Sequence, residues 1–194
     1  MKACSVLFRC IALVGASLVL SLPAWGAEPP PIGGPVHAVW TPKSYNFTFN
    51  GFTSHYSCEG LRDKLRIILL RLGARSDLEV VARGCGGGQS NVSAFPGAMI
   101  NMNVLTPVGG EVTVKPGTQP VTAQWQEVSL TYGKNPVEVA GDCELIEQVK
   151  EFILPLFNTK NVAYKSFCVP NQLILGGTTL SAYVLKSPEQ KAGR

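Results

Sequence analysis

Two segments of this 194-residue chain carry the same features in the same order, which limits the folds that the chain can adopt. Each segment opens with an alternation of apolar and polar residues, reaches a cysteine followed by a helical apolar pattern, and then reaches a second cysteine. The cysteines are Cys58 and Cys85 in the first segment and Cys143 and Cys168 in the second. This order predicts two β-α-β-β units.

The residues after Cys58 and Cys143 predict one helix in each unit. Apolar residues recur there in steps of three and four, which place one helix stripe against a sheet. Counted from the cysteines, Leu61 corresponds to Ile146. We expect Gly73 to end the first helix, and Pro155 to end or kink the second.

Six short runs have the composition or the period of two that is typical of strands. In chain order they are Tyr45–Phe49, Leu78–Ala82, Met99–Leu105, Gln126–Tyr132, Val162–Tyr164 and Leu173–Leu185, the last broken at Gly176 and Gly177.

The predicted fold is α+β: two β-α-β-β repeats form a mostly antiparallel sheet with two helices on one face, in a duplicated ferredoxin-like layering held by disulfides. This likeness concerns architecture and implies no function. The expected divisions are a signal peptide (1–27), a Pro/Gly-rich lead-in (28–43), one domain (44–186) comprising repeat one (44–106), an insert (107–125) and repeat two (126–186), and a flexible tail (187–194).

The first 27 residues have the parts of a secretory signal. Lys2 and Arg9 precede an apolar run from Ile11 to Leu22, and small residues follow at Gly26 and Ala27. An uncleaved anchor is the alternative, but the run is shorter than the about 20 residues of a membrane span. We therefore expect a periplasmic or secreted protein with no stable membrane insertion after the signal is removed.

The four cysteines of the mature chain are expected to form structural disulfides, because an exported chain with an even number of cysteines favours them. If each repeat is one unit, Cys58 pairs with Cys85 and Cys143 with Cys168. A redox pair is the alternative at a helix start, but the chain contains no C-x-x-C motif. Zinc binding is also disfavoured, because no two cysteines have close ligand spacing.

No cluster of residue types predicts catalysis, a cofactor or a metal site. His55 lies near Ser57 and Glu59, but residues so close in sequence rarely reach the geometry of a catalytic triad. Ser57 instead suits an N-cap, with Glu59 in the first helical turn. If a site exists between the repeats, His55, Tyr56, Glu59 and Arg62 are its first candidates.

The two predicted helices differ in charge. The first is rich in arginine and could form a surface for an acidic partner, while the second is acidic. The alternative is that both are solvated faces whose charges are complementary because the helices lie side by side. The surface residues are Arg62, Arg66, Arg71 and Arg75. Loss of Lys2 and Arg9 with the signal takes two charges from the formal net charge of +4 and leaves +2, and aromatic residues do not alternate with the arginines. Nucleic-acid binding is therefore not expected.

These observations predict an exported, non-catalytic binding or scaffolding domain whose partner is an envelope or extracellular protein. The alternative is a small periplasmic enzyme or ligand-binding protein with its site between the repeats, near the start of the first helix. The absence of a convergent acid, base, nucleophile or metal cluster in the sequence favours the binding domain.

Overall fold

The computed structural model describes residues 32–85, 95–109, 119–131, 142–169, 171–172 and 178–191. These residues form an α+β fold with a six-stranded antiparallel sheet, two α-helices and two disulfides. The elements are β1 (Ile32–Thr48), α1 (Cys58–Arg71), β2 (Glu79–Arg83), β3 (Gly97–Pro107), β4 (Val121–Thr131), α2 (Cys143–Gln148), the π-helix η1 (Val149–Ile153), the 3-10 helix η2 (Leu154–Leu156), β5 (Thr159–Ser166), β6 (Thr178–Lys186) and the 3-10 helix η3 (Pro188–Lys191). The predicted α+β class is confirmed.

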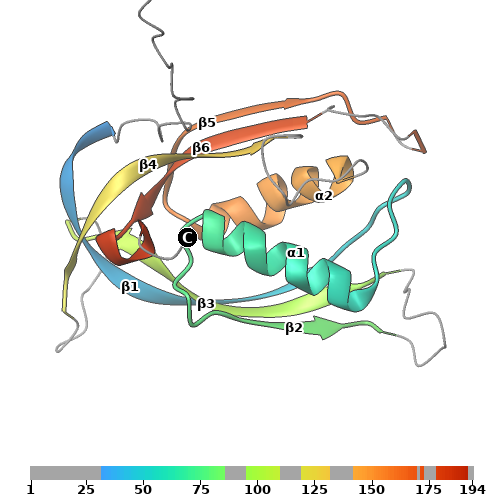
Figure 1. Ribbon diagram of the computed structural model, residues 1–194, viewed down its shortest axis with the longest axis horizontal. Coiled ribbons are helices and arrows are strands. Elements are labelled where there is room, and N and C mark those ends of the chain that lie inside the picture. The colour runs from blue at the N-terminus through green and yellow to red at the C-terminus, as the bar shows by residue number, and fades with distance from the viewer. Residues whose placement is uncertain are drawn as a thin grey trace, which may run out of the picture.

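The sheet opens along its middle. Its strand order is β2-β3-β1-β4-β6-β5, so β1 and β4 are the central strands. β1 pairs with β3 from Ala38 to Thr48, but it pairs with β4 only at Ile32 and from Val36 to Ala38. Beyond that point the central strands separate, and α1 and α2 lie between the two three-stranded halves (Figure 1).

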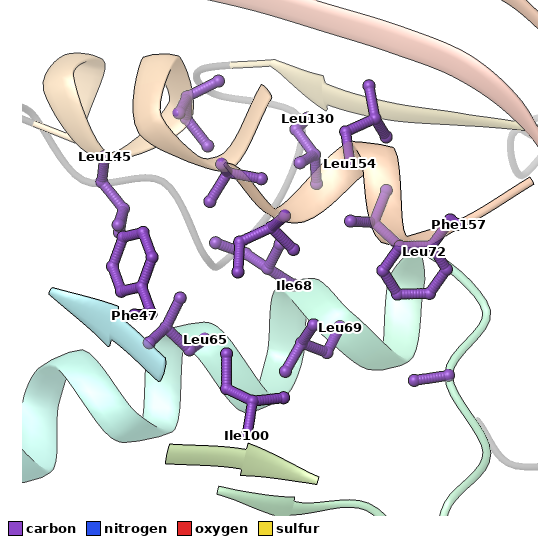
Figure 2. Packing of buried hydrophobic residues seen from close by; sticks show 14 of the residues in the cluster. Phe47, Leu65, Ile68, Leu69, Leu72, Ile100, Leu130, Leu145, Leu154 and Phe157 are labelled. Atoms are coloured by element: carbon purple, nitrogen blue, oxygen red, sulfur yellow. The ribbon is translucent and has the colours of Figure 1, made fainter. Parts of the chain in front are cut away.

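The two helices and both halves of the sheet share one hydrophobic core. Figure 2 shows side chains of α1 and of the α2–η1–η2 segment meeting between the strands that carry Ile100 and Leu130. Fully buried members include Leu61, Leu65, Ile68 and Leu69 of α1 and Val149 and Ile153 of η1. The stripes that the sequence predicted therefore face the sheet.

The predicted ends of the helices agree with the structure. α1 ends at Arg71, and Gly73 follows with a φ of +95°, a left-handed conformation that favours glycine. After α2 the chain widens into η1 and tightens into η2, which contains Pro155. Proline has no N–H and crowds the carbonyl one turn earlier, which accounts for the loss of the α-helical pattern here.

A smaller apolar cluster lies on the other face of the sheet, near the junction of the halves. Alternation along β3 directs Leu105 away from the helices, because Val104 faces them. Leu105 packs with Ala38, Ala123, Trp125 and Leu185. This cluster adds apolar contact where few hydrogen bonds join β1 to β4.

Both predicted disulfides are present. Cys58 is bonded to Cys85 and Cys143 to Cys168, with sequence separations of 27 and 25 residues. Each joins the start of a helix to chain that follows the next strand, β2 or β5. The two bonds therefore close loops of similar length within separate halves.

Most of the Pro/Gly-rich lead-in expected at 28–43 is strand, because the residues from Ile32 to Lys43 belong to β1. Proline and glycine favoured an extended polyproline conformation, and a strand is also extended, so the two states differ mainly in their hydrogen-bond partners. Pro42 is accommodated because it pairs with Asn103 of β3 while its nitrogen faces the opposite side, where none of the described residues pairs with it.

Two further boundaries differ from those expected. The insert at 107–125 is shorter, because Pro107 ends β3 and β4 begins at Val121. The tail at 187–194 contains η3, whose Gln190 donates hydrogen bonds to the carbonyl oxygens of Gly73 and Ala74 at 2.9 and 3.0 Å. The signal peptide at 1–27 lies outside the described residues.

Replacing Leu65 with alanine is expected to lower the free energy of unfolding by about 2–5 kcal/mol, because it leaves a cavity in the shared core. Ile67→Ala is the matched control, since the Ile67 side chain on the outer face of α1 is 42% exposed. It should change stability by less than about 0.5 kcal/mol. Urea unfolding followed by circular dichroism measures both, and equal losses would contradict this core assignment.

Candidate functional site

The turn before α1 caps the helix. The Ser57 side chain accepts a hydrogen bond from the backbone N–H of Gly60 at 3.1 Å, and Glu59 lies in the first turn. This confirms the capping prediction for both residues. The side chains of His55 and Glu59 are exposed, whereas that of Tyr56 is buried.

Tyr56 is buried and joins the starts of the two helices. Its hydroxyl donates a hydrogen bond to the carboxylate of Asp142, the residue before α2. Lys64 forms an ion pair with the other oxygen of that carboxylate, and its Nζ lies 5.2 Å from the centroid of the Tyr56 ring. One acid, one base and one phenol therefore satisfy each other.

The environment of Tyr56 holds its hydroxyl in the protonated form. Burial, then the charge of Asp142 and the hydrogen bond to it, then the charge of Glu144, raise the pKa of Tyr56 far above its ordinary value of 10.0. At neutral pH the phenol therefore keeps its proton and donates its hydrogen bond to Asp142. The cluster of Tyr56, Asp142 and Lys64 therefore serves as a tie between the helices.

The predicted arginine surface is partly engaged within the molecule. Arg62 pairs with Asp63, and Arg66 donates to the carbonyl oxygen of Leu78 at 2.9 Å. Arg75 pairs with Asp77 and stacks over Trp40, and Arg71 is half-buried. Lys64 of α1 forms an ion pair with Asp142 at the start of α2, so the opposed charges of the two helix regions meet there.

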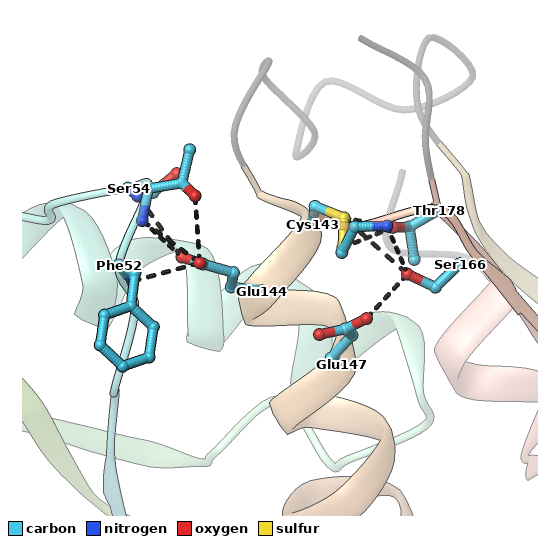
Figure 3. Close-up of a disulfide and its surroundings, with 9 residues drawn as sticks. Phe52, Ser54, Cys143, Glu144, Glu147, Ser166 and Thr178 are labelled. Atoms are coloured by element: carbon cyan, nitrogen blue, oxygen red, sulfur yellow. Dashed lines mark hydrogen bonds between the residues drawn. A yellow bond between two sulfur atoms is a disulfide. The ribbon is translucent and has the colours of Figure 1, made fainter. Parts of the chain in front are cut away.

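Glu144 fixes α2 to the chain that follows β1. Its carboxylate accepts hydrogen bonds from the backbone N–H groups of Phe52, Thr53 and Ser54 at 3.0 to 3.5 Å. Figure 3 shows Glu144 directed toward this loop, while Glu147 meets Ser166 of β5 on the other side. A Cβ at Gly51 would lie 2.2 Å from the buried Phe49 ring and 2.7 Å from a Glu144 carboxylate oxygen, so a larger residue there would displace these side chains.

One turn along α2, Gln148 continues the same contact. Its Nε2 donates to the carbonyl oxygen of Asn50 at 2.7 Å, and its Oε1 accepts from the N–H of Asn50 at 3.0 Å. A single carboxamide thus satisfies both backbone groups of one residue. A residue of a neighbouring antiparallel strand makes the same two bonds.

At the next turn this face of the helical segment carries the apolar Phe152, and a groove lies between Phe152 and β1. Phe152 of η1 follows Gln148 by four residues, and its side chain is 40% exposed. The groove has a volume of about 400 Å³ and lies between β1 and this helical segment. Its lining residues are Tyr45, Asn46, Phe47, Thr48, Asn50, Gln148 and Phe152.

The edge of β1 beside the groove has no strand partner among the described residues. β1 pairs with β3 on one side through Thr48, whereas its pairing with β4 stops at Ala38. The groove is therefore bounded by a free strand edge, an aromatic side chain and uncharged polar groups. Such a surface can hold an extended chain.

Neither a metal site nor a membrane span appears in the part of the chain that the structure describes. Within those residues no three histidine, cysteine, aspartate or glutamate side chains gather to hold a metal ion. Within the same residues, no helix combines the length and apolar character needed to cross a membrane. Comparison with protein families, curated proteins and solved structures gives no match.

Sequence reasoning identified Tyr56 but missed its partner Asp142 and the stripe of Glu144, Gln148 and Phe152. The stripe has a signal in the sequence, because its members are four residues apart and would lie along one helix face. The apolar stripe of the same helix dominated the pattern. A polar residue that bonds to a distant backbone has no recognisable spacing relative to its partner.

Tyr56→Phe is expected to reduce the loss of stability at alkaline pH. Burial raises the pKa of Tyr56 in the folded chain, so the phenol of the unfolded chain ionises first, at about pH 10.0. Below that pH the Tyr56 hydroxyl contributes fully to stability, and above it this contribution is lost as the pH rises. The wild type should lose up to about 1.4 kcal/mol per pH unit more than the variant above that pH. Denaturant unfolding between pH 8 and 11 tests this, and parallel curves would contradict it.

Proposed function

We propose that the mature protein is an exported, non-catalytic binding domain that captures a protein of the periplasm, the cell envelope or the extracellular space. The observation that carries this proposal is the edge of β1 that has no strand partner among the described residues, beside a groove lined by uncharged residues. Unpaired strand edges are templates for added chains, and proteins usually cover them. An edge left open next to an exposed aromatic side chain favours binding as the use of this surface.

Export is supported by the N-terminal signal pattern and by the cysteines. All four cysteines outside the signal are in disulfides, and such bonds persist in oxidising compartments. The sequence assigned the partner surface to Arg62, Arg66, Arg71 and Arg75, whereas Arg62 and Arg75 are paired with carboxylates and Arg66 donates to the carbonyl oxygen of Leu78. The groove is therefore the better candidate surface.

The non-catalytic role is supported by the way the polar groups at the helix starts are used. Tyr56, Asp142 and Lys64 bind each other, and Asp142 is 5% exposed, so substrate access to its carboxylate is small. The alternative of a small enzyme or ligand-binding protein relied on His55 and Glu59 at this junction. Their exposed side chains give that alternative no added support.

We also propose that the fold is a duplicated β-α-β-β unit with a ferredoxin-like layering. Support comes from the order of elements, since β1-α1-β2-β3 and β4-α2-β5-β6 are alike, and from the sheet, where β2-β3-β1 is mirrored by β5-β6-β4. Each disulfide joins a helix start to chain that follows the next strand of the same unit.

If the units are equivalent, a permuted chain that places residues 119–191 before 32–109 should fold. Each disulfide stays within one unit. Ile32 and Leu185 pair with Trp125 from its two sides, so the start of β1 lies close to the end of β6. A short Gly/Ser linker can therefore join the old termini. We expect both native disulfides by peptide mapping and a cooperative thermal transition. Scrambled pairing would contradict the equivalence.

Binding is tested by photo-crosslinking in the source cells. A photoreactive phenylalanine analogue at Phe152, expressed with the native N-terminus, is expected to form adducts with a defined envelope or extracellular protein. The same analogue at Phe167, whose side chain is 58% exposed after β5, is the control. Absence of groove-specific adducts at Phe152 would contradict the proposed function.

A further inference from the structure

We infer that the partner enters the groove as a short, extended, uncharged segment and adds to the sheet as an antiparallel strand on β1 between Ser44 and Thr48. This inference rests on the proposed function, because it specifies how the same surface recognises its partner. The recognition mode is strand addition, in which backbone hydrogen bonds provide affinity and alternate side chains provide selectivity.

The first step concerns the direction of the backbone groups of β1. The carbonyl oxygen of His37 accepts from Val108 at 2.8 Å, and the N–H of Phe49 donates to Pro96 at 2.9 Å, so odd-numbered residues bond toward β3. In an antiparallel pair the residues between them direct their groups to the other side. The backbone groups of Ser44, Asn46 and Thr48 therefore point toward the groove.

The second step is that the structure already contains a substitute for the added strand. Asn50 continues the even-numbered series, and the Gln148 carboxamide makes with it the pair of bonds that a strand residue would make. Two residues earlier along β1, at Thr48, the helix presents Phe152, which cannot form such bonds. A peptide group therefore fits where Gln148 ends.

The third step sets the length of the segment. Pro42 has no N–H and limits the ladder at one end, and Gln148 blocks it at the other. The window spans Ser44 to Thr48. We therefore expect about five paired residues of the partner, at one residue per roughly 3.4 Å.

The lining determines the side chains of the segment. The residues that line the groove carry no formal charge, so a charged side chain would lose hydration without gaining an ion pair. Side chains opposite Tyr45 and Phe47 face the side of the sheet on which Phe152 lies, and should be apolar. The side chain opposite Asn46 faces the other side and can be polar.

The wall of the groove favours a segment over a second copy of this chain. The η1 helix stands beside the β1 edge and leaves a groove of about 400 Å³, which is within the usual size range of ligand-binding pockets. Edge-to-edge pairing of two folded sheets would bring two such helices toward the same line. A single extended chain meets no such obstacle.

The first test uses peptides on the full mature protein. The probe is fluorescein-labelled acetyl-Ser-Val-Thr-Val-Ser-amide, which places valine on the Phe152 side and threonine opposite Asn46. N-methylation of the central residue removes a donor that faces β1, and should weaken binding at least about tenfold in fluorescence anisotropy. N-methylation of the fourth residue, whose N–H faces away, is the matched control and should leave binding within about twofold. Equal effects of the two peptides would overturn the inference.

The second test uses variants of the edge. Asn46→Pro removes an N–H that faces the groove and spares the ladder to β3, so the sheet should tolerate it. We expect at least about a tenfold loss of peptide affinity, with Asn46→Ala within about twofold of wild type. Backbone NMR shifts at Ser44 and Thr48 on addition of the peptide to wild type provide a readout if the proline variant does not fold. Unchanged shifts would overturn the inference.

The remaining outcomes separate the inference from the proposed function. If Phe152 crosslinks to a partner in cells but the Asn46→Pro variant forms the same adducts, the protein binds by another mode and only the strand inference fails. If the protein alone forms a dimer in sedimentation analysis that Asn46→Pro abolishes, the occupant is a second copy, which overturns the inference. Loss of groove crosslinks altogether removes the proposed function as well.

Discussion

The core shared by the two helices is the interaction on which the rest of the fold depends. The halves of the sheet are joined by only a few pairs between β1 and β4, at Ile32 and from Val36 to Ala38. Hydrogen bonds at so few positions cannot hold two sheets in one arrangement, whereas burial of both helical stripes contributes on the order of 25 cal/mol per Å² of apolar area. The helices therefore both separate the halves and hold them together.

Separation of β1 from β4 leaves backbone groups for which α2 provides hydrogen-bond partners only in part. Once β1 leaves β4, the backbone groups on that side of β1 and those of the following loop have no strand partner within the described part of the chain. Glu144 accepts hydrogen bonds from N–H groups of the loop, and Gln148 bonds both the N–H and the carbonyl oxygen of Asn50. Two successive turns of the helix therefore make hydrogen bonds that a neighbouring strand would otherwise make. The replacement ends where α2 becomes η1. A π-helix often marks a functional position, because the register change redirects side chains away from the usual helix face.

Local pattern and long-range contact explain what could be predicted from the sequence. The helix stripes, the disulfide pairing and most strands follow from periodicities within about ten residues, which is why α1, β2 and β3 agree closely. The start of β1 was missed because its partners lie far away in sequence, and no local signal distinguishes a paired strand from polyproline. Tyr56 was identified as a candidate, but its role depends on Asp142, 86 residues later. The groove was not predictable, since it forms only where β1, after leaving β4, lies beside Gln148 and Phe152 of the helical segment.

The size of the open window on β1 bears on how such an edge avoids aggregation. A long, flat, apolar edge would pair with any exposed strand, and proteins limit this risk with proline, lysine or covering elements. Here Pro42 and Lys43 stand at one end, Gln148 closes the other, and the residues between are the polar Ser44, Asn46 and Thr48 alternating with Tyr45 and Phe47. Indiscriminate pairing needs longer ladders than this window allows, so on the proposed mode the few backbone hydrogen bonds need the support of side chains that fit against Phe152. An edge restricted in this way would bind a partner less tightly but more selectively than a long free edge.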